Sequence, residues 1–285
     1  MKKATKWFAV AVVLLTVVAG MAGKASAEIK FGILPRLSSE VLYGMFKPLA
    51  EYLTKETGEK VSIVIPKDFE GFKDAVKAGQ VDVGFANPLI YVQLKKDSKI
   101  SPLALAVEDK AGKRFRGIII ARTDSGINKI QDLKGKKLVF VEKDSAAGYI
   151  FQMLQLSKAG LNAQKDFVTL PFAMKHDKVT MAVFNKEADA GGIREDDLEK
   201  MKNRVDLSQI KIVAYTDYYP NWPMFGTSKM NNNATAKIKA ALLKLNPDDG
   251  GSSRLLVAAG LTGFTPVTDK DYDLLRKAAK VAGAF

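Results

Sequence analysis

The hydrophobic and polar positions of this chain alternate between two periods from residue 28 to residue 215. Short β-branched or aromatic runs, typical of strands, alternate with segments whose apolar residues recur every three or four positions, typical of helices. Val41, Met45, Leu49 and Leu53 have helical spacing, and Gly58 ends that helix. Strands that alternate with helices predict mostly parallel sheets, so we expect an α/β fold.

The pattern predicts strands at 28–34, 61–65, 81–86, 103–108, 116–122, 138–141, within 166–172, at 188–193 and at 210–215. It predicts helices at 40–57, 69–78, 88–95, 130–133, from Ser145 onward, and at 175–186, 195–202, 234–245, 252–259 and 269–282. Pro220 and Pro223 are expected to exclude regular structure from the segment around them.

Two segments of the chain resemble each other, 79–91 and 186–195. Each passes from a helix through a turn into (Val/Ala)-Asp-(Val/Ala)-Gly and then a polar turn into a helix. The similarity predicts two related α/β lobes rather than one long sheet.

The stretch 136–156 is expected to form a strand, a tight polar turn and a helix. Ser145 is the expected N-cap, and the small residues Ala146, Ala147 and Gly148 allow a ligand to approach the backbone of the first turn. Free N–H groups and the helix dipole at such a turn attract anions. An ordinary strand–helix turn has the same pattern, so the stretch alone leaves both interpretations open.

Residues 1–27 have the pattern of a secretory signal peptide. Lysines precede an apolar segment at 8–22, and Ala25-Ser26-Ala27 fits a cleavage site, so the mature chain is expected to begin at Glu28. A retained membrane anchor is disfavoured because a membrane span needs about 18–20 apolar residues. The chain has no cysteine, which excludes lipid attachment at the cleavage site, disulfides and thiol chemistry. We therefore expect a protein of the periplasm.

The chain is basic, with a formal net charge of +13. The predicted signal peptide holds four lysines (residues 2, 3, 6 and 24) and no acid, so 13 − 4 leaves +9 for the mature chain. No basic run is interleaved with aromatic residues, and export also argues against nucleic acid as a partner. The scattered lysines form a solvated surface whose field favours small anions.

Several motifs together resemble the phosphate/phosphite/phosphonate-binding proteins of ABC transporters, a family that includes the phosphonate-binding PhnD-like proteins. They are IKFGILP at the mature start, VDVGFANPLIYV at 81–92, DSAAGY at 144–149 and KHDKVTMAVFNKEADAGGI at 175–193. Their order and spacing cover most of the mature chain.

The resemblance implies a two-lobed periplasmic-binding-protein fold of type II. Each lobe would be a mixed sheet flanked by helices, with two crossover strands near 117–122 and 213–216 as the hinge. Lobe I would comprise 28–119 and 216–285, and lobe II 120–215. It also implies a small anionic ligand in the cleft between the lobes, a membrane permease as partner, a monomer and no cofactor.

The resemblance also implies a ligand site. Ser145, with the N–H groups of Ala147 and Gly148, would hold oxyanion oxygens, and His176 would donate to the same group. Tyr91 would lie against the ligand from lobe I. The candidate ligand-binding residues are Arg36, Ser38, Asn87, Tyr91, Ser145, Ala146, Ala147, Gly148, Tyr149, His176, Arg194 and Glu195.

One departure bears on the ligand. Ala146 and Ala147 stand where the family often has hydroxyl residues, which weakens the cage around a phosphoryl group unless Arg36 or Arg194 replaces the lost contacts. Another small oxyanion therefore stays an alternative to a phosphonate, phosphite or phosphate.

Three other functions can be considered for this sequence. Tyr91, Tyr149, Tyr218, Tyr219 and Trp222 offer an aromatic cage for a quaternary amine. A sensing role, in which the closed protein reports its ligand to a membrane receptor, would use the same cleft. An enzyme built on Ser145 and His176 is disfavoured, because no nucleophile elbow surrounds the serine and no third member of a triad is evident. With one histidine and no cysteine, a metal site is not expected.

Overall fold

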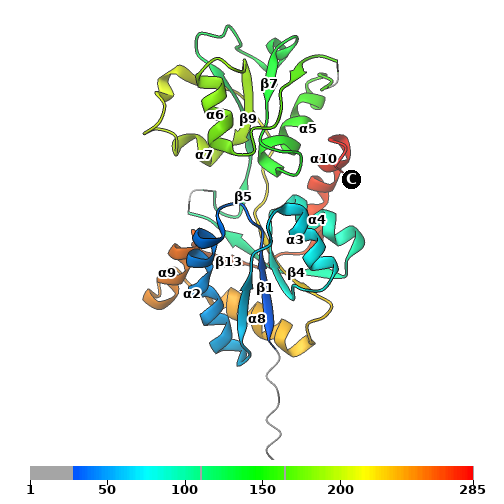
Figure 1. Ribbon diagram of the computed structural model, residues 1–285, viewed down its shortest axis with the longest axis vertical. Coiled ribbons are helices and arrows are strands. Elements are labelled where there is room, and N and C mark those ends of the chain that lie inside the picture. Colours follow the sequence, from blue (N-terminus) through cyan, green and yellow to red (C-terminus); the bar gives the residue numbers. More distant parts are fainter. Residues whose placement is uncertain (1–27, 110, 164, 285) are drawn as a thin grey trace, which may run out of the picture.

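The computed structural model describes residues 28–109, 111–163 and 165–284. The predicted signal peptide and its cleavage site lie outside the described residues. Two sheets follow one another along the long axis of the molecule (Figure 1). We call the body around the six-stranded sheet lobe I and the body around the five-stranded sheet lobe II. The predicted two-lobed α/β fold is confirmed.

The sheet of lobe I has the strand order β13-β4-β12-β3-β1-β2. Its strands are β1 (Ile29–Ile33), β2 (Val61–Val64), β3 (Val83–Phe85), β4 (Ile100–Val107), β12 (Pro223–Thr227) and β13 (Gly263–Thr265). β1 pairs in parallel with β2 and β3, whereas β12 is antiparallel to both β3 and β4. The carboxyl ends of β1, β3 and β4 therefore lie at one edge of this sheet, together with the start of β12.

The helices of lobe I follow the predicted pattern closely. They are α2 (Ser39–Thr57), α3 (Phe69–Lys77), α4 (Pro88–Asp97), α8 (Asn232–Lys244), α9 (Gly250–Ala259), the 3-10 turn η4 (Asp269–Tyr272) and α10 (Asp273–Val281). Gly58 ends α2 in the left-handed conformation, with φ of 74°, and its N–H donates to the carbonyl oxygen of Thr54. Phe31, Phe46, Phe85 and Phe225 belong to one buried core.

The sheet of lobe II has the order β10-β6-β9-β7-β8. Its strands are β6 (Gly117–Arg122), β7 (Lys137–Val139), β8 (Val168–Thr169), β9 (Ala190–Arg194) and β10 (Ile210–Tyr215). Its helical segments are the 3-10 turns η1 (Ile130–Leu133) and η3 (Leu207–Gln209), the π-helical turn η2 (Ala146–Ile150), α5 (Phe151–Lys158), α6 (His176–Phe184) and α7 (Glu195–Glu199). β7 runs parallel to β9, so both end at the same edge.

The chain passes between the lobes twice, before β6 and after β10. At the crossing, β5 (Arg114–Phe115) pairs antiparallel with β11 (Tyr219–Pro220) (Figure 1). The ring of Tyr219 stacks on Phe151 at 3.8 Å between centroids, which joins this ribbon to the start of α5. α10 also packs against α5, so the C-terminal helix of lobe I reaches lobe II (Figure 1).

The two similar sequence segments have the same structural role. Asp82 precedes β3 and Asp189 precedes β9, and the carboxylate of each accepts a backbone N–H from the neighbouring strand, from Lys30 at 2.8 Å and from Lys137 at 2.7 Å. Each aspartate also donates its own N–H to the carbonyl oxygen of that same residue, at 2.9 Å in both lobes. The short match therefore reflects two related lobes.

The expectation that Pro220 and Pro223 exclude regular structure is wrong. Pro220 lies in β11, and Pro223 is the first residue of β12, which lies between β4 and β3. A proline is tolerated at the first position of a strand because that position can do without the N–H. β13 was not predicted, since three residues carry little periodicity.

Several predicted boundaries also differ from the structure. The expected strand within 166–172 is reduced to the two residues of β8, and α7 ends at Glu199 rather than continuing to residue 202. β6 begins at Gly117, ahead of the predicted lobe boundary at 120, because Gly117 already pairs with Arg194 of β9. Among the described residues, no helix is long and apolar enough to cross a membrane.

Candidate functional site

The carboxyl edges of the two sheets face each other between the lobes. Arg36 follows β1 and Glu108 follows β4 in lobe I, while Arg194 ends β9 in lobe II. The guanidinium of Arg194 donates to the carboxylate of Glu108, which spans the two lobes directly. The space between these edges is where parallel strands of α/β proteins hold ligands.

The turn after β7 belongs to this edge and is wound as a π-helix rather than the expected α-helix. The carbonyl oxygen of Ser145 accepts the N–H of Ile150 at 3.1 Å. Ser145 occupies the N-cap position and is buried, but its hydroxyl makes no capping bond and has no hydrogen-bond partner among the described residues. The N–H groups of the first helical turn have no partner within a helix. The turn therefore offers N–H donors of the kind that an anion needs.

Gly148 is the residue that lets this turn close so tightly. A Cβ at this position would lie 2.4 Å from Cγ2 of Val141 and 2.7 Å from Oγ of Ser145, which no side chain tolerates. The N–H of Val141 donates to the carbonyl oxygen of Gly148 at 3.1 Å. The end of the strand and the turn are thus locked together.

Gln152 holds the Ser145 turn in place through hydrogen bonds. The sequence pattern did not identify this residue. This fully buried residue donates Nε2–H to three carbonyl oxygens, those of Ala147 at 2.6 Å, Ile193 at 3.0 Å and Ile118 at 3.1 Å. It therefore ties the turn to β9 and to β6. Polarity at an apolar position of the predicted helix was the only sequence signal of this role.

His176 begins α6 at the same edge. Its Nδ1 accepts the backbone N–H of Arg194 at 3.0 Å, which leaves the ring proton of a neutral imidazole on Nε2. Burial lowers the pKa of His176, although Asp197 opposes the shift. Near neutral pH His176 is therefore an uncharged donor through Nε2, and among the described residues no hydrogen bond joins it to Ser145.

Arg194 and Glu195 are both engaged by neighbours. Besides Glu108, the guanidinium of Arg194 contacts Asp196 at 2.8 Å and lies over the ring of Phe115. Glu195 forms a bidentate pair with Arg116, with both distances 2.7 Å. Their charges are therefore largely satisfied within the protein.

Arg36 is in a different position. It forms no ion pair with any described residue, and its guanidinium lies 5.4 Å from the ring centroid of Trp222. Although much of the side chain is exposed, desolvation by the surrounding protein lowers the pKa of its guanidinium, and the attraction of Glu108 does not fully oppose this. An uncompensated guanidinium beside a cleft is a site that an anion stabilises.

Of the other predicted residues, Asn87 contacts the residue before the Ser145 turn and Tyr149 belongs to the turn, whereas Tyr91 does not lie in the cleft. Tyr91 is fully buried, and its hydroxyl donates to Asp269 at 2.6 Å, so it belongs to the core of lobe I. Asn87 caps α4 and donates its amide to the carbonyl oxygen of Asp144 at 3.3 Å. Ser38 precedes α2 and is exposed, and the ring of Tyr149 packs against Phe140 and Phe172.

The aromatic cage does not form either. Tyr91 packs against Tyr272, Tyr219 stacks on Phe151, and Tyr218 and Trp222 each face an arginine. The rings that a quaternary amine would need are therefore used by the core and by guanidinium groups. The described residues also contain no cluster of acids and histidine that could hold a metal ion.

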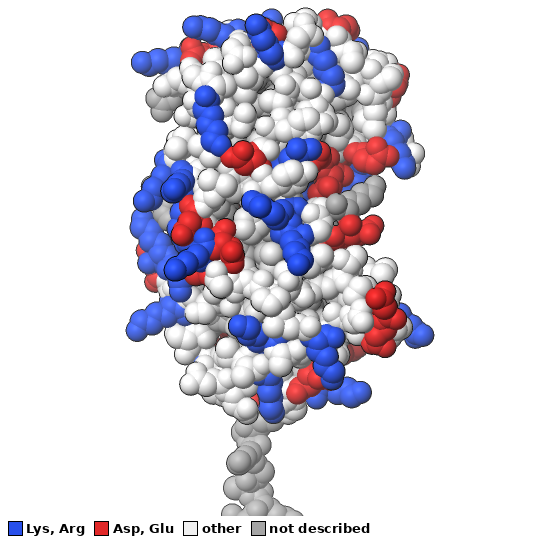
Figure 2. Space-filling model, turned by 180° about the vertical axis from the view of Figure 1, so that it is seen from behind, with Lys and Arg blue, Asp and Glu red and all other residues white. Residues whose placement is uncertain are grey.

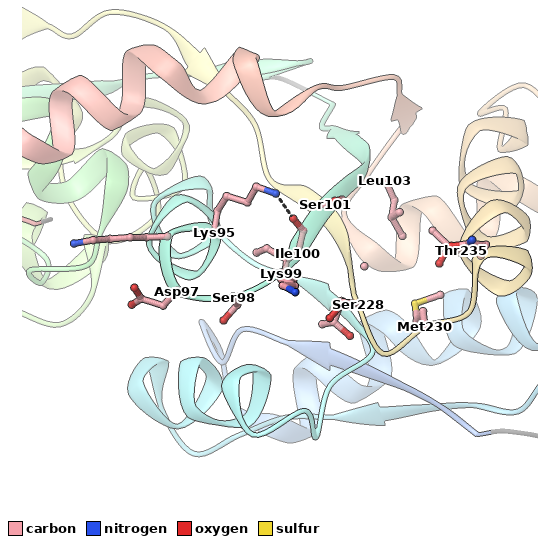
Figure 3. Close-up of a pocket in the computed structure, with 14 residues that line it drawn as sticks. Lys95, Asp97, Ser98, Lys99, Ile100, Ser101, Leu103, Ser228, Met230 and Thr235 are labelled. Carbon is pink, nitrogen blue, oxygen red and sulfur yellow. Dashed lines mark hydrogen bonds between the residues drawn. The ribbon is translucent and has the colours of Figure 1, made fainter.

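A separate groove of about 640 Å³ lies at the opposite edge of the sheet of lobe I (Figure 3). Its lining includes Ile100 at the start of β4 and Thr227 at the end of β12, and Lys95 folds over so that Nζ donates to the carbonyl oxygen of Ile100 at 2.5 Å (Figure 3). None of the predicted site residues lines it. On the face seen in Figure 2, basic and acidic side chains are intermixed.

The comparison with protein families decides the assignment. A family model described as "ABC transporter, phosphonate, periplasmic substrate-binding protein" matches residues 31–272. The chain belongs to this family. Members of the phosphonate substrate-binding family are binding proteins, which agrees with the prediction that the chain is not an enzyme.

Relatives within and around the phosphonate substrate-binding family match most of the chain. The phosphate-import protein PhnD of Mycolicibacterium smegmatis is 29% identical over 90% of this chain and 86% of that protein. The phosphonates-binding periplasmic protein of Escherichia coli is 23% identical over 74% of this chain, which spans 64% of that protein. The structure of PhnD1 from Prochlorococcus marinus in complex with methylphosphonate has a TM-score of 0.77 at 18% identity, covering 90% of this chain and 99% of that chain. At this identity the likeness establishes the fold.

Glu142, on the loop before the turn, makes the stability of lobe II depend on pH. Burial, with a smaller contribution from Asp144, raises the pKa of its carboxyl from 4.5 to about 6. A raised pKa means that the folded protein holds the proton more tightly, so this stabilisation is complete below about pH 4.5 and is lost as the pH rises through about 6.

We therefore expect Glu142→Gln to stabilise the protein at pH 7.5 by about 1 kcal/mol, after allowance for solvent screening at this half-buried site. In thermal melts this corresponds to a rise in Tm of about 2–4 °C. The gain should disappear near pH 4.5. A gain that stays constant with pH would show that the Glu142 carboxyl is not responsible.

Proposed function

We propose that this protein is the substrate-binding component of an ABC transporter and captures a small phosphorus oxyanion, such as a phosphonate, phosphite or phosphate, between its lobes. The observation that carries the proposal is that each lobe presents donors suited to an anion. Lobe II presents free N–H groups at the Ser145 turn, and lobe I presents the uncompensated guanidinium of Arg36. Together they supply donors and one positive charge to an anion.

The order of binding follows from the positions of these donors. The ligand first meets the Ser145 turn and Nε2–H of His176 on lobe II, and closure then brings Arg36 of lobe I onto it. Closure excludes water, which strengthens each hydrogen bond to the anion. A membrane permease then recognises the closed form. In this proposal the protein is exported to the periplasm as a monomer, with its signal peptide cleaved after Ala27.

Arg36 also compensates for Ala146 and Ala147, which stand where the family often has hydroxyl residues. Each missing hydroxyl removes a hydrogen bond to a charged oxygen of the ligand, which contributes about 1.5–3 kcal/mol. The planar guanidinium of Arg36 can donate two hydrogen bonds of this kind to the anion. A bidentate contact from Arg36 therefore offsets the loss. Arg194 is less suited to this role because Glu108 and Asp196 already hold it.

The cleft should also discriminate against a ligand that carries an ammonium group. The carboxylates beside Arg194 are each paired with a cation, Glu108 and Asp196 with Arg194, Glu195 with Arg116 and Asp197 with Lys200. An ammonium group would have to break one of these pairs. We therefore expect 2-aminoethylphosphonate to bind at least about 10-fold more weakly than methylphosphonate.

Calorimetric titration tests the proposal. The protein is exported, processed, unfolded and refolded to remove carried-over ligand, and then titrated with phosphate, phosphite, methylphosphonate, 2-aminoethylphosphonate, sulfate and choline. We expect tight binding of at least one phosphorus oxyanion. Tight binding of sulfate or choline alone would contradict the proposed ligand class, and tighter binding of 2-aminoethylphosphonate would contradict only the expected discrimination.

A further inference from the structure

Asp144, which precedes the Ser145 turn of lobe II, accepts hydrogen bonds from three side chains of lobe I. The carboxylate of Asp144 accepts Nζ–H of Lys73 at 3.2 Å and Nε2–H of Gln93 at 3.0 Å. Its backbone carbonyl oxygen accepts Nδ2–H of Asn87 at 3.3 Å. Lys73 lies on α3, Gln93 on α4, and Asn87 caps α4.

These contacts are partly shielded from solvent. The side chains of Lys73 and Asp144 are only 14% and 18% exposed, so their attraction is screened less than that of a surface pair. A small cavity of about 300 Å³ adjoins them, lined among others by Lys143 and Ala284. All three contacts require the lobes to be close together, because their partners lie on opposite lobes.

The contact with Asn87 reaches the binding turn through the backbone. The carbonyl oxygen of Asp144 and the N–H of Ser145 belong to one planar peptide group, so fixing one orients the other. Asn87 holds this group from lobe I, and the carbonyl oxygen of Glu142 accepts the Ser145 N–H at 3.1 Å within lobe II. The first peptide of the turn is therefore held from both lobes only when they are closed.

We infer that Asp144 is a positioning residue that couples closure of the lobes to the geometry of the oxyanion-binding turn. Its carboxylate faces Lys73 and Gln93, so it acts on the ligand through Ser145 and through the population of the closed state. The inference rests on the proposed function for its effect on affinity, but its effect on closure is independent of any ligand. Another cross-lobe pair, Glu108–Arg194, lies within the cleft and cannot separate these two effects.

The test is a double-mutant cycle with Lys73→Met and Asp144→Asn, in which asparagine keeps an acceptor for Gln93 while the charge is removed. The first measurement is small-angle scattering of the ligand-free protein. We expect either substitution to increase the radius of gyration, and the double variant to resemble the single variants. The second is titration with methylphosphonate, for which we expect each single variant to bind about 5- to 30-fold more weakly and the double variant to be no weaker than either.

Lys134→Met is the matched control, because Lys134 pairs with Asp166 at 3.5 Å within lobe II and closure leaves that pair unchanged. It should alter neither dimensions nor affinity. Wild-type dimensions in both Lys73→Met and Asp144→Asn would overturn the inference whatever the ligand, as would equal loss of affinity in the control. If the wild-type protein binds no phosphorus oxyanion but the variants still expand, the proposed ligand is wrong and the coupling to closure stands.

Discussion

Replacement of Arg36 by methionine is expected to weaken binding of the phosphorus oxyanion by about 30- to 150-fold. The substitution removes a charge-assisted contact of about 2–3 kcal/mol. Methionine keeps an apolar side chain of similar length and removes only the guanidinium, which lies over Trp222. Because the guanidinium has no ion-pair partner among the described residues, its removal leaves no orphaned carboxylate, and thermal stability should be unchanged. Calorimetric titration of the variant gives the affinity.

Two further variants make the result specific. Arg254→Met removes the same charge from an exposed position on α9 and should leave affinity unchanged at physiological salt. Arg36→Lys keeps the charge but not the planar fork, so an intermediate loss is expected. If Arg254→Met weakens binding as much as Arg36→Met, the effect comes from net charge and Arg36 is not in the site.

Replacement of Gln152 by leucine is expected to destabilise the protein by about 2–4 kcal/mol. The change removes three buried hydrogen bonds, to the carbonyl oxygens of Ala147, Ile193 and Ile118, and each contributes about 0.5–1.5 kcal/mol. The buried and unpartnered Oε1 of the same side chain is removed as well, which offsets part of this cost. Thermal melts should show a fall in Tm of about 5–15 °C.

The same substitution should also weaken oxyanion binding, since the Ser145 turn loses its attachment to β6 and β9. Gln155→Leu, on the same helix at a partly exposed position, is the control and should change stability by less than about 0.5 kcal/mol. Equal melting temperatures for the two variants would show that the three carbonyl oxygens find other donors.

Much of the fold could be predicted from patterns among residues that lie close together in the sequence. The helix that ends at Gly58 and the strand–turn–helix around Ser145 both depend on residues close together in the chain. The prediction that Pro223 excludes regular structure was wrong because proline is tolerated at the first position of a strand. Only the structure of the sheet shows that β12 starts at this residue.

The contacts around the candidate site were harder to predict because they join distant parts of the chain. Arg194 and Glu108 are 86 residues apart, and Lys73 and Asp144 are 71 apart, so no local pattern connects them. Tyr91 has an aromatic ring and a hydroxyl, as many ligand contacts do. Its hydroxyl, however, donates to Asp269, which lies 178 residues away in the sequence. The turn at Ser145 was predictable because a short run of small residues after a strand has a direct physical meaning.

In the proposed function, a small phosphorus oxyanion binds between the Ser145 turn and Arg36. The chain has two tryptophans, and the predicted cleavage removes Trp7, so Trp222 beside Arg36 is the single tryptophan of the mature protein. Its fluorescence therefore reports on the cleft directly. On titration with methylphosphonate and phosphate, we expect a saturable change with one of them, with a dissociation constant below about 1 µM. No change with either ligand up to about 1 mM, a level that corresponds to roughly 4 kcal/mol of binding, would contradict it.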